Sequence, residues 1–277
     1  MILSLNGIIA GRGVAPFVGL LDTYTGATGA YSLRKLRSTY NGNCIRVRRS
    51  SDNTSQDIGF VNNELDTTSL LSFVGANNGF VSIWYDQAGT SNMIQNTSSI
   101  QPTIVSSGSL VLDGGKPAIF FNNQRFSLVS PSINVSEHSL FYVGKSSGVS
   151  SNNGALVVLN STPSDNPEIR LGKDVSTLSY WNGGYVLNGN YTMSVRKVYS
   201  SFITGNKTHD LYGNNSLLAT GTRAGTFNNV TELTLGGYAQ FNGFQVGYMS
   251  ECIMYLNDQT TNRTGISNNI NTYYSIY

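Results

Sequence analysis

Short apolar runs alternate with clusters of turn-forming residues along most of the chain. From residue 79 onward the order is strand, turn, strand, and the turns fall at clusters such as SSGVSSNNG, STPSDNP and YGNN. Gly, Asn, Asp and Ser are the residues that tight turns favour. Regularly spaced short strands are typical of β-sandwiches and jelly rolls. The pattern therefore predicts an all-β fold.

Three segments have the spacing of helices instead. Residues 28–40 (TGAYSLRKLRSTY) combine partial helical spacing of apolar residues with good helix formers. Residues 65–75 have Asp66 in the position of an N-cap and Gly75 at the end. In the tail, residues 261–277, Ile and Tyr recur at spacings that indicate an amphipathic helix lying on the sheet.

The chain divides into an arm and one domain. Residues 1–22 are Gly-rich and weakly apolar, and we expect an extended N-terminal arm that docks the protein on another one. Residues 23–277 contain no internal repeat and no Pro/Ser-rich linker, so they are predicted to form a single jelly-roll domain.

Composition narrows the classes of function. Only 12% of the 277 residues are charged and the net charge is +2, so neutral Asn, Ser, Thr and Tyr groups supply most of the polarity. One dense cationic run, RVRR at 46–49, is too little for a nucleic-acid partner. No stretch has the ~20 apolar residues of a membrane span, and the first residues are not a convincing signal peptide.

Metal and redox chemistry also lack a motif. Cys44 and Cys252 are far apart in the sequence and match no metal-ligand spacing. We expect two buried thiols, with a single long-range disulfide as the alternative. His138 and His209 are in no metal motif, so neither a metal site nor a cofactor is predicted.

The stretch GFVSIWYDQAG, residues 79–89, allows two interpretations. An aromatic pair that runs into an acid and an amide can form the wall of a sugar site, or it can be a strand end whose Asp ties a turn. We interpret Trp84 or Tyr85 as a core residue and Asp86, followed by Gln87, as the tie of the turn. The predicted neighbours in a buried polar network are Arg48, Arg49 and Asp52.

Four segments in this order carry a resemblance to a known family. They are AYSLRKLRSTYNGNCIRVRRSSDNTSQDIGF, WYDQAG, LDGGKPAIFF and the C-terminal GYMSECIMYLNDQTTNRTGISNNINTYYSIY. Together they resemble the catalytic domain of fungal α-L-arabinofuranosidase B, a concanavalin A-like jelly roll, and the tail resembles the close of laminin-G-like modules. Similar stretches resemble virion surface proteins of bacteriophages. The resemblance implies a concanavalin A-like jelly-roll β-sandwich with a few short helices.

The resemblance also implies the positions of two catalytic carboxylates. This sequence has neither Asp nor Glu at those positions. Retaining glycosidases need two carboxylates about 5 Å apart. The family's nucleophile segment corresponds to LSYWNGGYVLNGN (178–190), which has no Asp or Glu, and Tyr238 stands where the acid would follow Gly236-Gly237. We therefore predict that the chain is not an enzyme and has no catalytic residues.

The two segments that lack the family's catalytic carboxylates are predicted to form a carbohydrate-binding site instead. Aromatic faces stack on sugar rings while neutral amides bond the hydroxyls. The alternative is that these side chains fill the sandwich or contact a neighbouring subunit. The candidate residues lie on two turns and are Tyr180, Trp181, Tyr185, Tyr238 and Phe241.

The main functional prediction is a non-enzymatic phage virion protein, such as a head fibre, capsid decoration or tail-associated part. Its expected partners are other virion proteins bound through the arm, further copies of itself in a homotrimer, and host cell-surface glycans; its expected location is the virion surface. One alternative is a secreted, extracellular carbohydrate-binding module. The other is an arabinofuranosidase-like glycoside hydrolase with displaced carboxylates, taken from Asp165, Glu168, Asp174 and Glu251.

Overall fold

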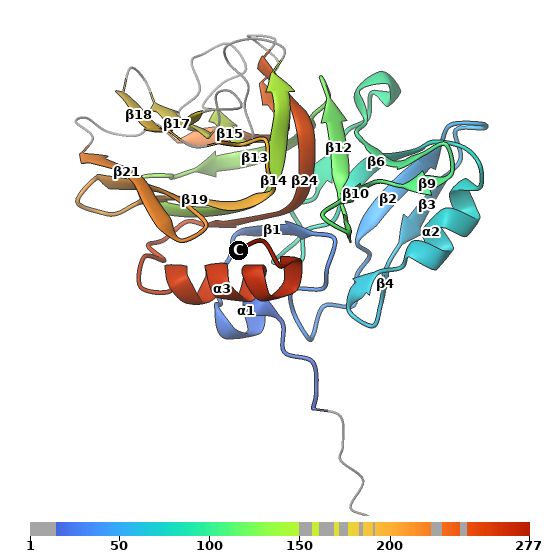
Figure 1. Cartoon of the computed structure of the whole chain (residues 1–277), viewed down its shortest axis with the longest axis horizontal. Helices are drawn as coiled ribbons and strands as arrows, with labels where there is room; N and C mark the ends of the chain where they lie inside the picture. Colours follow the sequence, from blue (N-terminus) through green and yellow to red (C-terminus); the bar gives the residue numbers. More distant parts are fainter. Residues whose placement is uncertain are drawn as a thin grey trace, which may run out of the picture.

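The computed structural model describes residues 15–149, 157–160, 169–171, 177–182, 185–190, 192–222, 229–238 and 243–277. Hydrogen-bonded ladders join most of the described strands, and the ladders fold into two facing layers (Figure 1). The helices are α1 (Leu20–Thr23), α2 (Thr67–Val74) and α3 (Arg263–Tyr274), with a 3-10 turn η1 at Ser98–Ile100.

The first layer is built around the long strand β24, which pairs with β1, β12 and β14. From β14 the layer continues through β19 and β20 to β21. Its strands are β1 (Gly29–Ser32), β12 (Ile119–Asn122), β14 (His138–Val149), β19 (Lys197–Ile203), β20 (Thr208–Gly213), β21 (Ser216–Thr222) and β24 (Gly243–Tyr255).

The second layer runs from β3 through β2, β6, β7, β13, β22, β15 and β16 to β17 and β18, with β8 and β9 beside β6. Its strands are β2 (Ile45–Arg49), β3 (Ser55–Ile58), β6 (Gly79–Trp84), β7 (Met93–Ile94), β8 (Thr103–Ser106), β9 (Ser109–Leu110), β13 (Phe126–Ile133), β15 (Val157–Asn160), β16 (Ile169–Leu171), β17 (Thr177–Asn182), β18 (Tyr185–Asn190) and β22 (Val230–Leu235).

The remaining strands are short. Two hairpins stand apart from the layers, β4 (Phe60–Val61) with β5 (Glu64–Leu65), and β10 (Leu112–Asp113) with β11 (Lys116–Pro117). The last strand, β23 (Gly237–Tyr238), pairs with the start of β24.

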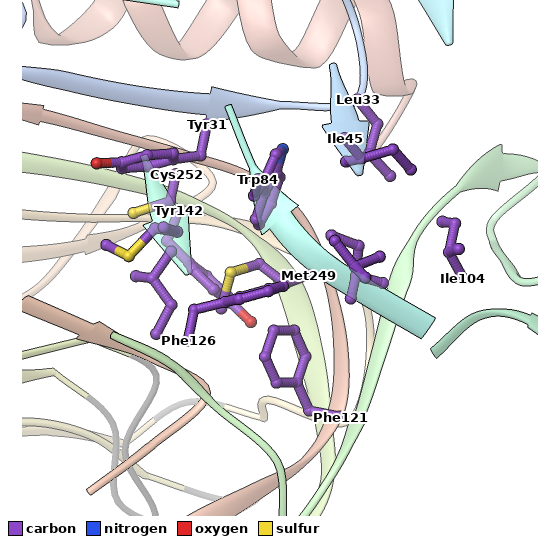
Figure 2. Packing of buried hydrophobic residues seen from close by; sticks show 14 of the residues in the cluster. Tyr31, Leu33, Ile45, Trp84, Ile104, Phe121, Phe126, Tyr142, Met249 and Cys252 are labelled. Carbon is purple, nitrogen blue, oxygen red and sulfur yellow. The ribbon is translucent and has the colours of Figure 1, made fainter. Parts of the chain in front are cut away.

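Alternation along the strands creates two hydrophobic cores. On β14, Leu140 and Tyr142 point into the core between the layers, whereas Phe141 and Val143 point to the opposite face. Trp84 lies at the centre of the first core, with ring centroids 6.2 Å from both Tyr31 and Phe126 (Figure 2). The predicted all-β jelly-roll sandwich with a few short helices is confirmed.

The second core lies under two helices. Leu20 and Leu21 of α1 and Ile266 and Ile270 of α3 pack on the outer face of the first layer, where Figure 1 places both helices below β1 and β19. The predicted amphipathic C-terminal helix is therefore confirmed.

The short helix α2 also follows its sequence signals. The Asp66 carboxylate accepts the backbone N–H of Ser69 at 2.9 Å, and Gly75 at φ +61° ends the helix. By contrast, the predicted helix at 28–40 is wrong. Residues 29–32 instead form β1, which pairs with β24 and is buried on both faces. Pairing with a strand more than 200 residues away in the sequence outweighs the local helix propensity.

Residues 19–22 lie against the domain. Leu21 donates its backbone N–H to Leu36 O at 2.8 Å, and the Leu20 side chain is buried. Residues 1–14 are outside the described part of the chain, so the docking role of the arm stays a prediction.

The two cysteines are free and buried, as expected. Burial raises the pKa of both thiols, to about 12 for Cys252. Within the described ranges, no helix has the length and hydrophobicity needed to cross a membrane.

A buried ion pair joins β1, β24 and α3. The Arg34 guanidinium donates to Glu251 from Nε at 2.8 Å and from Nη2 at 3.0 Å, and Ser32 Oγ donates to the same carboxylate at 2.7 Å. Burial alone would lower the pKa of Arg34, but the Glu251 carboxylate raises it. The planes of Tyr273 and Tyr274 cover the guanidinium at 4.8 and 5.7 Å, which supports the interpretation of Glu251 as structural.

We expect Glu251→Gln to lower the free energy of unfolding by about 3–5 kcal/mol, because it leaves the Arg34 charge buried without its counter-ion. Urea denaturation followed by tyrosine and tryptophan fluorescence measures the change. Asp52→Asn in the exposed Arg49–Asp52 pair is the control and should leave the midpoint within error. Equal midpoints for the two variants would contradict the assigned role.

Two buried histidines predict a loss of stability in acid. Burial lowers the pKa of His138 from 6.5 to about 4 and that of His209 well below 6.5. The unfolded chain binds protons that the folded chain excludes, so stability falls as pH drops from about 6.5 to about 4. For His138 alone the loss is on the order of 3 kcal/mol. Urea midpoints across this range measure it, and a His138→Asn/His209→Gln variant should have a shallower slope; an unchanged slope would refute the assignment.

Candidate functional site

The end of β6 is a joint between the two layers. The buried Asp86 carboxylate accepts backbone N–H groups from Ala30 on β1 at 2.8 Å, and from Ala88 and Ser91 in its own turn at 2.8 and 3.3 Å. Burial raises the pKa of Asp86, and these N–H donors offset part of that shift. Asp86 therefore ties its turn, as the sequence predicted, and fastens it to the other layer as well.

Gln87 completes the joint with its side-chain amide. Its Oε1 accepts the Leu36 backbone N–H at 2.7 Å, and its Nε2 donates to Ser32 O at 3.1 Å and Arg34 O at 2.9 Å. Together with fully buried Trp84, this makes the motif a structural element and not a sugar-binding wall.

Trp84 is the core residue of the aromatic pair, whereas the arginine run differs from the prediction. Tyr85 is only partly buried, and its hydroxyl donates to Asp57 at 2.7 Å. Arg48 and Arg49 pair with Phe80 and Gly79, at the far end of β6 from Asp86. Arg49 binds exposed Asp52 there. The predicted network of Asp86 with Arg48, Arg49 and Asp52 is therefore wrong. The register of β2 against β6 places the two arginines at the opposite end of β6 from Asp86.

Arg48 instead holds the loop that follows β7. Its Nε donates to Gln101 Oε1 at 2.7 Å and its Nη2 to Ser98 O at 3.1 Å. Gln101 Nε2 donates to Gln95 O, and Gln95 Nε2 to Arg125 O, each at 2.8 Å. Both glutamines are buried. Successive hydrogen bonds from their side-chain amides therefore fix residues 95–101 against the start of β13.

A pocket of about 450 Å³ lies beside this loop. Such a volume lies within the usual range of small-molecule sites. Arg125 is the one formally charged residue of the lining, and amide, hydroxyl and aliphatic side chains supply the rest. The lining residues are Asn92, Ile94, Gln95, Asn96, Thr97, Ile100, Arg125, Ser127 and Leu128.

The pocket opens on the outer face of the second layer. Phe126 is buried in the core, so its neighbour Ser127 belongs to the outer face. Ser127 pairs with Thr234 on β22, and Thr234 pairs with Val158 on β15. Glu232 comes two residues before Thr234 and shares its face.

Strand register extends this face toward β18. Val158 pairs with Arg170, and Arg170 with Trp181. Within the described parts of β7, β13, β15–β18, β22 and β23, Glu232 is the one carboxylate. It was not among the sequence candidates, although the alternating VTELTL run could have placed it opposite the buried Leu233 and Leu235.

Register divides the predicted aromatic cleft. Tyr180 pairs with Leu187, which packs against the inner core, and Tyr185 pairs with Asn182 on the same face as Tyr180. Trp181 belongs to the opposite face, with Arg170. For these residues and for Tyr238 on β23 only the strand position is described, and Phe241 lies outside the described residues. Carbohydrate binding by these aromatics stays a prediction.

The other predicted chemistry can be placed only in part. Asp165, Glu168 and Asp174 lie outside the described residues. Among the residues that are described, no group of three His, Cys, Asp or Glu side chains is arranged to hold a metal ion.

Comparisons with known proteins find a family model that matches part of the chain and several structures of similar fold. The model of the family "Alpha-L-arabinofuranosidase B, catalytic" matches residues 22–124. Two similar structures are GH54 α-L-arabinofuranosidases, one a mutant soaked with 4-nitrophenyl α-L-arabinofuranoside and the other soaked with a cyclic sulfate inhibitor, each with a TM-score of 0.70 and 17% identity. A third is an arabinofuranosidase complexed with arabinofuranosyl-α-1,2-xylobiose, with a TM-score of 0.67 and 18% identity.

Each of these three matches covers 91% of this chain. The chain spans 65% of the length of each of the first two proteins and 64% of the length of the third. At this identity they establish a shared fold. No curated protein sequence matches the chain.

The comparisons confirm the resemblance and correct the predicted function. The matched family is a catalytic domain and the similar structures are arabinofuranosidases, so the predictions of a non-enzymatic virion protein and of no enzyme activity are wrong. The arabinofuranosidase-like alternative is the better supported one. The homotrimer and the location of the protein stay predictions.

We expect Asp86→Ala to lower the free energy of unfolding by about 2–4 kcal/mol, since it leaves three backbone N–H groups without their acceptor. Asp258→Ala is the matched control, because exposed Asp258 accepts the Thr260 N–H at 2.8 Å in a similar turn; it should cost less than about 0.5 kcal/mol. Urea denaturation compares the two. If Asp86→Ala kept full stability but lost ligand binding, the motif would be a binding site after all.

Proposed function

We propose that this chain is a glycoside hydrolase-type domain that cleaves terminal α-L-arabinofuranosyl groups. The observation that carries the proposal is the match of residues 22–124 to the arabinofuranosidase B catalytic family. The fold shared with arabinofuranosidases over 91% of the chain supports it.

Hydrolysis of a glycosidic bond requires two carboxyl groups. One protonates the oxygen of the leaving group, and the other attacks the anomeric carbon or activates a water that does so. The segment to which the resemblance assigns the nucleophile has neither Asp nor Glu. On the proposed function, the carboxylates therefore lie elsewhere in the chain.

Glu232 is the residue that we assign to one of these roles. It is partly buried on β22, paired with Val129 on one side and Asn160 on the other. Its face also carries Arg170 and Trp181 by register, so charged, amide and aromatic residues occupy neighbouring strand positions. The candidates for the second carboxylate are Asp165, Glu168 and Asp174, which flank β16 in the sequence.

The test is release of 4-nitrophenol from 4-nitrophenyl α-L-arabinofuranoside, compared with the heat-denatured protein. We expect turnover by the native protein and a fall in kcat of about 10²–10⁴-fold for Glu232→Gln, the usual range for loss of an acid or base. Glu137→Gln, in the turn before β14, is the control and should leave kcat unchanged. Single Asp165→Asn, Glu168→Gln and Asp174→Asn variants identify the second group.

The possible outcomes separate the assignment from the function. Turnover that survives Glu232→Gln would remove Glu232 from the mechanism while keeping the hydrolase. No release by the native protein from the 4-nitrophenyl glycoside or from an arabinofuranosyl-xylobiose would refute the proposed function.

A further inference from the structure

We propose that the pocket between the loop 95–101 and β13 binds a neutral sugar unit from the main chain of a glycan and takes no part in the chemistry. The proposal rests on the proposed function for the kind of glycan, because an arabinofuranosyl group that such a domain removes is a branch on a main chain. The volume of about 450 Å³ lies within the usual range of small-molecule sites and accommodates a mono- or disaccharide.

Three neutral polar side chains of the lining are left for a ligand. The amide of Asn96 and the hydroxyls of Thr97 and Ser127 make no hydrogen bond within the part of the chain that the structure describes. Asn96 and Thr97 are exposed and Ser127 is partly exposed, so these groups are accessible. Amides and hydroxyls both donate and accept hydrogen bonds, as the hydroxyl groups of a sugar do.

The rest of the lining does not favour a charged or a wholly apolar ligand. The lining contains no carboxylate, and Arg125, its one charged residue, already interacts within the chain, so neither sign of charge is reserved for a ligand. Ile94 and Ile100 contribute aliphatic surface, but no aromatic ring is present, whereas sites for apolar small molecules are mostly hydrophobic and aromatic. A sugar ring, with hydroxyls at its edge and C–H groups on its faces, matches this mixture of neutral polar and aliphatic side chains.

The pocket is held in shape from two sides before any ligand arrives. On one side, Arg48, Gln101 and Gln95 hold the loop through successive side-chain hydrogen bonds. On the other side, Asn92 Oδ1 accepts the backbone N–H of Asp86 at 3.0 Å, which links the pocket to the joint between the layers. A rigid site loses less conformational freedom on binding, so modest contacts suffice for measurable affinity.

The position of the pocket suits the main chain of a branched substrate. Ser127 pairs with Thr234 on β22. Glu232 precedes Thr234 by two residues on the same face, about 7 Å along the strand. A main-chain sugar in the pocket would thus hold the branches of the glycan near Glu232, to which the proposed function assigns the chemistry.

The test is calorimetric titration of the full chain with two linear, neutral tetrasaccharides, β-1,4-linked xylotetraose in one arm and β-1,4-linked galactotetraose in the other. We expect at least one of them to bind with a Kd of about 1 mM or tighter, as a few neutral hydrogen bonds allow. The affinity should not change at high salt, because the ligand has no charge for salt to screen. The two arms distinguish the two kinds of main chain.

The first variant removes one hydroxyl of the lining at nearly constant volume. Thr97→Val should weaken binding by about three- to tenfold, the usual effect of losing one hydrogen bond. Thr220→Val is the matched control, because Thr220 is an exposed threonine on β21, outside the lining and in the other layer, and its Kd should equal that of the native protein.

A second variant tests the pocket by filling it. Asn96 is exposed on the loop, so Asn96→Trp should abolish binding while the urea midpoint stays within error. No binding of either tetrasaccharide, an affinity that falls with added salt, or unchanged binding by Thr97→Val and Asn96→Trp would each overturn the proposal. Neither tetrasaccharide contains arabinofuranose, so failure here and failure of the hydrolysis assay are distinguishable.

Discussion

The two layers of the sandwich depend on a joint made by two side chains at the end of one strand. Asp86 and Gln87 close β6 and satisfy backbone groups of β1 and of the segment that follows it. Each of these bonds is buried, so each would cost desolvation energy if its partner were lost. Through Asn92 the same turn fixes one wall of the pocket, and through β1 it positions the Arg34–Glu251 pair that anchors α3.

Side chains along each strand alternate between the two faces of a sheet, and this alternation decides which residues are buried and which line the outer faces. Inward positions build the core between the layers, and the outward positions of the first layer are covered by α1 and α3. On the second layer the outward positions form the face with the pocket at β7 and β13 and Glu232 on β22.

The resemblance to arabinofuranosidases is unevenly spread along the chain. The family match ends at residue 124, and it includes the joint, Arg48 and the loop that lines the pocket. The strands that carry Glu232, Arg170 and Trp181 come after it. The matched part of the chain thus supplies a scaffold, and the proposed chemistry depends on strands that come after it.

Local signals in the sequence determined much of the architecture. Alternation and turn clusters predicted the sandwich, Asp66 and Gly75 bounded α2, and the spacing of Ile266 and Ile270 predicted α3. These signals act within one turn or one strand, so they can be read from neighbouring residues. Tertiary structure alone decided that residues 29–32 form a strand, that Arg48 holds the loop 95–101, and that Arg125 and Asn92 meet in one pocket. Those outcomes depend on strand register and on contacts between distant segments, which only the packing of the whole chain sets.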